Sequence, residues 1–162
     1  MAFTAFVGRC MFAFVFLASA VTKLQTLLDG GAASTLDMLG PRLDAAKAML
    51  ATKTGIDLGL LPIRDAHMLA AATVLEGAGA VLFVLDIALG AKMLLLFVLV
   101  VTPIMHPFWT HAADPSSAVY SVDMIAFFKN VALAGALLFY CDMQAPVAAL
   151  RRDRRGNGAK RD

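Results

Sequence analysis

Residues 67–105 read HMLAAATVLEGAGAVLFVLDIALGAKMLLLFVLVVTPIM and are predominantly apolar. The stretch holds two apolar runs, about 67–89 and 90–106, that meet at Gly90. The first run is long enough to cross a hydrocarbon core of about 30 Å as a helix. The second reaches that length if Lys92 extends its amine to the membrane surface, and Pro103 should kink its exit. The tight connection at Gly90 predicts that the two helices are antiparallel neighbours.

Two further apolar runs, about 3–24 and 121–141, bring the number of candidate membrane spans to four. They should be helices, because an open sheet edge in lipid would leave backbone groups unpaired. Hydrophobic residues make up 60% of the 162 residues and charged residues only 16%. A soluble enzyme of this size could not hide so much apolar surface, and the same figures exclude disorder, a collagen-like fibre and a disulfide scaffold. We therefore predict an all-α fold: a four-transmembrane-helix bundle that forms one domain, residues 1–146.

The connection 25–66 is long and has a pattern of its own. Within it, Thr35–Lys53 places leucine, methionine and alanine near helical spacing, with charged residues between them and Pro41 expected in the first turn. This pattern is typical of an amphipathic helix that lies in the interface or over a bundle. The last segment, 147–162, is basic and contains glycine, and we expect a disordered tail there.

Basic residues near the helix ends indicate the topology. Four crossings put both termini on one side of the membrane, together with Lys92 and the basic tail. The positive-inside rule then favours the cytosolic or matrix-like side for both termini. We expect the tail to contact anionic lipid headgroups through its arginines, Arg151, Arg152, Arg154 and Arg155.

Three charged residues lie deep within the predicted spans, more than three residues from either end: Arg9, Glu76 and Lys129. At 1.5 Å per residue they lie about 21, 14 and 12 Å below the loop-side face. Glu76 therefore lies in depth between two cations, which would hold its carboxylate ionised. We predict that Glu76 contacts Lys129, Arg9 or both. Such a buried charge cluster could lock the bundle together, or it could form a proton or substrate site.

All three histidines gather near the loop-side face, and Trp109 lies beside two of them. His67 opens the second predicted helix, whereas His106 and His111 flank the exit of the third. They are possible ligand-binding residues, together with Trp109, or polar residues seated at the interface. Their spacing does not match a zinc site, and the two cysteines, Cys10 and Cys141, lie in apolar runs, so we expect no metal.

Several catalytic signatures are missing from the sequence. It contains no phosphate-binding loop, no nucleophile elbow and no module that reads nucleic acid. We therefore predict no catalytic residue and no nucleic-acid partner, and consider an enzyme less consistent with the sequence than a non-catalytic protein. No cofactor is predicted, although a quinone or another lipid could bind.

Several short motifs resemble one known family. They are Met1-Ala2-Phe3 with Gly8-Arg9, Thr54-Gly55-Ile56-Asp57, Leu75-Glu76-Gly77-Ala78-Gly79, Leu89-Gly90-Ala91, Thr102-Pro103-Ile104, and the run Phe128–Tyr140 that leads to Met143. Together they resemble the HR-like lesion-inducing protein family of plants and algae, a branch of the DoxX-like membrane proteins. The resemblance implies a four-helix membrane bundle and no established reaction. His106-Pro107-Phe108-Trp109 is more similar to the His-x-Phe-Trp pattern of bacterial DoxX proteins.

Three functional hypotheses follow. The first is a small non-catalytic membrane protein that serves as an accessory or structural subunit of a larger complex, respiratory or otherwise organellar. The second, which draws on the resemblance, is a DoxX-like redox-associated protein that binds quinone or another lipid-soluble ligand near His106, Trp109 and Glu76. The third is a proton or solute path through the buried charges, although four helices without repeats are few for a transporter. The sequence leaves the mitochondrial inner membrane and the endoplasmic reticulum both open as locations.

Overall fold

The structure, a computed structural model, describes residues 3–29, 32–55 and 65–158. In chain order, the elements are α1 (Phe3–Leu28), α2 (Ala32–Thr54), α3 (Asp65–Val84), α4 (Ala88–Met105), the short 3-10 helix η2 (Phe108–His111) and α5 (Ala118–Gly158). No strand occurs in these ranges. The predicted all-α fold class is confirmed.

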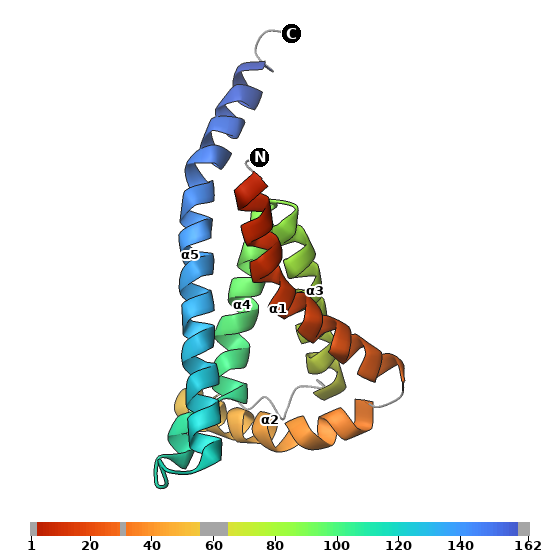
Figure 1. Ribbon diagram of the computed structural model, residues 1–162, viewed down its shortest axis with the longest axis vertical. Helices are drawn as coiled ribbons and strands as arrows, with labels where there is room; N and C mark the ends of the chain where they lie inside the picture. The colour runs from red at the N-terminus through yellow and green to blue at the C-terminus, as the bar shows by residue number, and fades with distance from the viewer. Residues whose placement is uncertain (1–2, 30–31, 56–64, 159–162) are drawn as a thin grey trace.

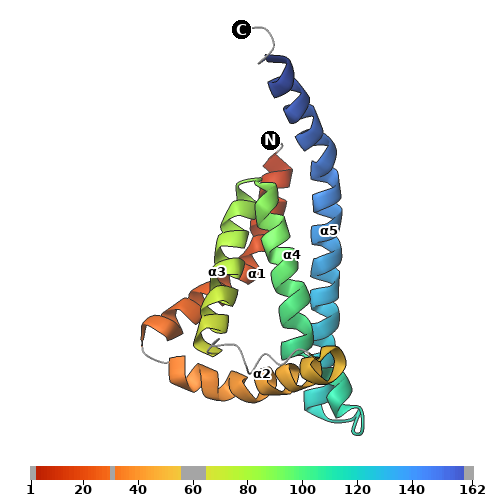
Figure 2. The same cartoon turned by 180° about the vertical axis from the view of Figure 1, so that it is seen from behind.

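Helices α3, α4 and α5 run along the long axis of the molecule, α1 crosses that axis obliquely, and α2 lies across one end of the bundle (Figures 1 and 2). The start of α1 and the end of α5 lie at the opposite end (Figure 1). The segments long and apolar enough to span a membrane are Phe3–Leu28, His67–Val84, Ala88–His111 and Ala118–Gln144. The chain is therefore a multi-pass membrane protein, and α2 is the predicted amphipathic helix, placed over the end of the bundle.

The core forms where α1, α3, α4 and α5 meet. It is built from alanines, aromatic rings and leucines whose side chains are buried: Ala13, Phe16, Ala80, Phe83, Ala91, Leu94, Phe97, Val98, Ala134 and Leu137. Many large apolar side chains point outward instead, such as Phe14 on α1 and Ile125 on α5. An apolar exterior over an apolar core is what a lipid environment allows, because lipid tails are as apolar as the side chains.

The turn between α3 and α4 makes them antiparallel neighbours, as the sequence predicted. Gly90 permits this close contact: a Cβ there would lie 2.3 Å from the backbone nitrogen of Phe83 and 2.6 Å from the carbonyl oxygen of Gly79. Asp86 ends α3 with a φ of 63°, in the left-handed region. Its N–H bonds to the Phe83 carbonyl, and the N–H of Ile87 bonds to the Leu82 carbonyl. This is the Schellman ending of a helix, with Asp86 where glycine is usual.

Two elements differ from the sequence-based expectation. Pro41 lies well inside α2 rather than in its first turn. The backbone after Pro146 continues as helix α5 through Gly158, where we expected a disordered tail. The segment 147–152 (VAALRR) is rich in alanine, leucine and arginine, which are strong helix formers, and this accounts for the continuation. The loop expected between α2 and α3 falls largely on residues outside the described ranges.

Candidate functional site

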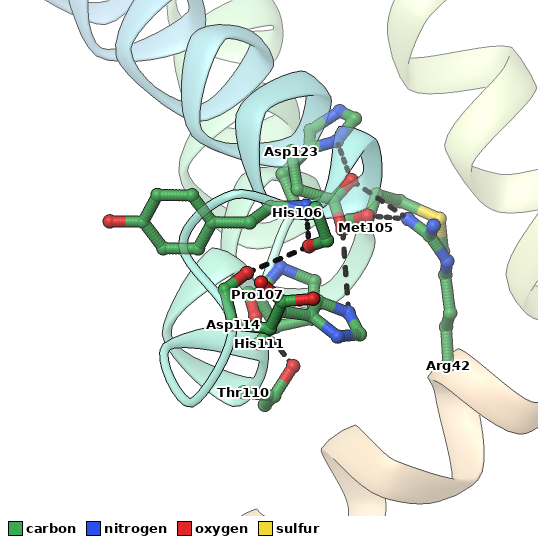
Figure 3. Close-up of polar contacts among 10 residues, drawn as sticks. Arg42, Met105, His106, Pro107, Thr110, His111, Asp114 and Asp123 are labelled. Carbon is green, nitrogen blue, oxygen red and sulfur yellow. Dashed lines mark hydrogen bonds and ion pairs between the residues drawn. The ribbon is translucent and has the colours of Figure 1, made fainter.

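A polar centre lies at the end of the bundle that α2 covers (Figure 3). Its hub is Asp123, in the second turn of α5 and only 3% exposed. Nδ1 of His106, at the end of α4, lies 3.3 Å from Oδ1 of Asp123. Nη1 of Arg42, on α2, lies 3.5 Å from the same oxygen. Arg42 also donates a hydrogen bond to the carbonyl oxygen of Met105, so it ties α2 to both α4 and α5.

The second carboxylate oxygen of Asp123 has no hydrogen-bond partner among the described residues. Nε2 of His111, on η2, lies 3.9 Å from Oδ2, which is too far for a hydrogen bond. In the part of the chain that the structure describes, Oδ2 is the one buried side-chain nitrogen or oxygen without a hydrogen-bond partner. A buried acceptor left unpaired costs about 1–3 kcal/mol, so its persistence calls for an explanation.

Local chain geometry places these groups. The N–H of His106 bonds to the Thr102 carbonyl and closes α4, and Pro107 leads into η2. Asp114 then accepts hydrogen bonds from the N–H and hydroxyl of Ser116, which shapes the turn before α5. The hydroxyl oxygen of Ser117 accepts from the N–H of Tyr120 in the first turn of α5. This short, well-bonded connection brings η2 back against α5.

An aromatic cluster supports η2. The ring of Phe108 lies 5.2 Å from that of Phe127 and 6.0 Å from that of Tyr120, centroid to centroid. Trp109 packs edge-on against Phe127 at 5.7 Å and remains partly exposed. Aromatic rings at this level agree with the belt found where a membrane meets water.

A cavity of about 460 Å³ adjoins the polar centre. Residues of α2, the end of α4, η2 and the start of α5 enclose it, with Arg42, Asp123 and His111 among the polar ones and Met49 and Ile104 among the apolar ones. Its volume falls within the range typical of small-molecule sites, roughly 300–1,000 Å³. Among the described residues, no group of three or more His, Cys, Asp or Glu is arranged to hold a metal ion.

Three of the four possible ligand-binding residues lie together in the structure. His106 and His111 both face Asp123, and Trp109 lines the same cavity as His111. His67 is exposed at the start of α3 and is not part of this centre. The sequence analysis missed Asp123 because it lies at the edge of an apolar run, where an acidic residue is easily taken for a flanking one.

The predicted cluster of Arg9, Glu76 and Lys129 does not form. Glu76 is buried, but its Oε2 pairs with Nζ of Lys23 at 2.5 Å. Arg9 is also buried; its Nη1 lies 3.1 Å from Oδ1 of Asp86, and its Nε donates to the Val84 carbonyl. Lys129 is exposed on α5. Depth along the membrane normal could not reveal these partners, because the rotation of each helix decides which side chains face one another.

The sequence contained a pattern that could have placed Lys23 on the buried face of the first helix. Lys23 follows Ala13, Phe16 and Ala20 at helical spacing, and these residues form the buried face of α1. The prediction ended the first span at about residue 24 and did not include Lys23 among the buried charges, whereas α1 continues to Leu28. Its amine also lies 5.1 Å from the centre of the Phe97 ring, a favourable cation–π contact.

Comparison with known proteins supports the resemblance seen in the motifs. No curated protein and no solved structure matches the chain significantly. The sequence model of the HR-like lesion-inducing family matches residues 1–143, which cover three spans completely and the fourth except for its last residue. The chain therefore belongs to the HR-like lesion-inducing family.

Proposed function

We propose that the protein is a non-catalytic accessory subunit that packs into a larger membrane complex through one face of α5. The observation that carries this proposal is the position of Lys129. It lies about 16 Å along the span that begins at Ala118, close to the middle of that span. Its side chain is exposed, and no residue that the structure describes pairs with it.

A cation in this position is costly if it faces lipid. Translocon-based scales assign about 2.5–3.5 kcal/mol to a lysine at the centre of a membrane helix. A lysine stem of four carbons spans only part of the distance to the interface. An acidic side chain on a neighbouring subunit would remove most of this cost, because it would neutralise the charge where it lies.

The surface around Lys129 suits helix packing. Ala132 and Ala136 follow it at helical spacing and are exposed, as are Phe128 and Phe139 on the same side of α5. Small residues four apart let two backbones approach in lipid, and the aromatic rings add contact area. We call this surface, Phe128, Lys129, Ala132, Ala136 and Phe139, the Lys129 face. The partner we expect is a membrane helix with an acidic residue near the bilayer centre.

The test is assembly in the native membrane. On a native gel of gently solubilised membranes, the wild-type protein should migrate in a large complex, and Lys129→Leu should release it. Lys129→Arg keeps the charge and should retain the complex. Lys92→Leu is the matched control, because Lys92 is an exposed lysine near the start of α4, on a different helix from Lys129. A wild-type protein that migrates alone, or a Lys129→Leu variant that stays in the complex, would refute the proposal.

We propose a second candidate function, binding of a quinone or similar lipid-soluble molecule, on the basis of Asp123. A hydroxyl could donate to the unpaired Oδ2, and a carbonyl could accept from His111, so one cavity would suit both redox forms of a quinone. A photoactivatable quinone should label the wild-type protein, and Asp123→Asn or His111→Ala should reduce the labelling at least threefold. His67→Ala, outside the centre, should leave it unchanged. Equal labelling of all four proteins would exclude this function.

A further inference from the structure

A second cavity, of about 540 Å³, lies at the end of the bundle opposite α2. Its walls come from α1, the end of α3 and α5 and are mainly apolar, with Phe12, Phe83 and Met143 among them. The polar residues that line it are Arg9, Asp86, Tyr140 and Gln144. We call it the Asp86 cavity. Within the described ranges α5 packs against α4 and η2 but not against α1, so the cavity opens sideways between α1 and α5.

Asp86 occupies a backbone position that favours glycine. A residue other than glycine with left-handed φ and ψ costs roughly 1–2 kcal/mol, although aspartate tolerates the conformation better than most. A glycine would complete the same Schellman ending without this cost. The carboxylate must therefore contribute something that the turn itself does not need.

One oxygen of that carboxylate, Oδ1, accepts every hydrogen bond that described side chains donate to Asp86. Oδ1 of Asp86 receives Nη1 of Arg9 at 3.1 Å, the Tyr140 hydroxyl at 2.5 Å and Nε2 of Gln144 at 2.8 Å. The Gln144 amide also donates to the Tyr140 oxygen at 2.8 Å. The phenol proton and both amide protons are thus already used, and the charges of Arg9 and Asp86 offset each other.

The other oxygen remains available. Oδ2 of Asp86 accepts no hydrogen bond from any residue in the described part of the chain, and the side chain is 22% exposed. Asp86, Tyr140 and Gln144 can therefore still accept hydrogen bonds, but the donor hydrogens of Tyr140 and Gln144 are already used. A ligand that pairs with this oxygen must be a donor, and because the charges of Arg9 and Asp86 offset each other, a neutral ligand suits the cavity.

From this geometry we propose that the Asp86 cavity binds a neutral lipid that carries a hydroxyl group. The hydroxyl donates to Oδ2, and the apolar body lies against the rings of Phe12 and Phe83 and leaves between α1 and α5 into the bilayer. A sterol and a diacylglycerol both have this chemistry, a single hydroxyl on an apolar body. The cavity shares Ala136 and Phe139 with the Lys129 face, whereas its polar residues all lie outside that face. The lipid proposal is argued from those polar residues, so it does not rest on the proposed subunit role.

The experiment uses the full-length protein in nanodiscs and photoactivatable lipid probes. One probe is a sterol with a free hydroxyl, one is a diacylglycerol, and a methyl ether of each lacks the donor. A hydrogen bond to a charged acceptor is worth enough that each hydroxyl probe should label at least about tenfold more strongly than its ether. The preferred hydroxyl probe identifies the source of the ligand. Equal labelling by hydroxyl and ether probes, or labelling by neither hydroxyl probe, would overturn the proposal.

Two glycines provide a matched pair of variants. A Cβ at Gly8 or at Gly135 would meet no atom within 4 Å, so either position should accept a leucine. Gly8 lines the Asp86 cavity, whereas Gly135 lies outside it. Gly8→Leu should therefore reduce labelling by the preferred hydroxyl probe at least fivefold, and Gly135→Leu should leave it unchanged. Labelling that survives Gly8→Leu would place the lipid elsewhere and refute the assignment.

Asp86→Asn tests the acceptor directly. Asparagine tolerates the left-handed backbone, so the turn should keep its shape. Labelling by the hydroxyl probe should fall to the level of the ether probe. A melting curve of the same sample, which should remain cooperative, separates this loss from unfolding. If Asp86→Asn folds and still prefers the hydroxyl probe, Oδ2 is not the acceptor.

Discussion

The Lys23–Glu76 pair predicts an asymmetric response to mutation. Glu76 is 3% exposed, whereas the side chain of Lys23 is 28% exposed and also lies over the Phe97 ring. Lys23→Met leaves a buried carboxylate without a cation. Glu76→Gln leaves a half-buried amine that keeps its aromatic contact. We therefore expect Lys23→Met to be the more destabilising of the two changes.

The magnitudes follow from burial. Removing one partner of a buried pair costs about 3–5 kcal/mol when the remaining charge has no other partner, which is the situation of Glu76 in Lys23→Met. Uptake of a proton by Glu76 would limit the loss at low pH. For Glu76→Gln we expect about 1–3 kcal/mol, because the amine retains partial exposure and its cation–π contact. The double variant should lose less than the sum of the two, with a coupling of roughly 0.5–3 kcal/mol.

The assay is unfolding of the full-length protein in mixed micelles by titration with SDS. Fluorescence of Trp109, the one tryptophan of the chain, and circular dichroism report the transition. Glu76→Gln combined with Lys129→Met is the control cycle, because Lys129 is exposed on another helix and should be additive within about 0.5 kcal/mol. Additive losses at Lys23 and Glu76, or coupling between Glu76 and Lys129, would refute the pairing.

Three further predictions concern packing, the position of α2 and topology. Gly90→Ala should destabilise the protein by at least about 2 kcal/mol in the SDS titration, because its Cβ would meet backbone atoms. Gly135→Ala, whose Cβ would meet no atom, should be neutral or slightly stabilising. Equal effects of the two substitutions would contradict the close contact at Gly90. Arg42→Ala should loosen α2 and speed hydrogen exchange of its backbone relative to α4, and unchanged exchange would show that apolar contacts hold α2. In a cysteine-free background, Thr52→Cys and Ser116→Cys should react with an impermeant thiol reagent from one side of sealed vesicles, and Lys92→Cys should react from the other side. We expect the side of Lys92 to be the cytosolic or matrix-like one. Any other pattern would contradict the four-span topology.

The helices could be predicted from the sequence because each depends on local properties. Apolar runs of membrane-spanning length, the glycine at position 90 and the amphipathic pattern of Thr35–Lys53 all have one reasonable structural interpretation in lipid. Helix ends were harder to place. Lys23 lies in the last two turns of α1, where a charged residue can be the end of a span or part of its buried face.

The polar contacts could not be predicted because they depend on how helices rotate and cross. Arg9, which pairs with Asp86, is 77 positions away in the sequence, and Arg42, which pairs with Asp123, is 81 positions away. Both lie near the ends of apolar runs, where acidic residues usually face water. His106, His111 and Trp109 could be identified because aromatic and imidazole groups that cluster in one short segment are visible without a fold.

The ion pairs explain how these helices find one register. In lipid, apolar side chains gain little from packing against each other rather than against acyl chains, so apolar contacts alone specify register weakly. Arg9 and Lys23 on α1 pair with Asp86 and Glu76, at and before the end of α3. The pairs run in opposite order along the two segments, as antiparallel neighbours require. A shift of one helical turn, about 5.4 Å, would break both pairs at once and leave buried charges unpaired. A further ion pair, between Arg42 and Asp123, fixes α2 to α5 in the same way. Lys129 has no such partner among the described residues, and by the same reasoning we propose that a neighbouring subunit pairs with it.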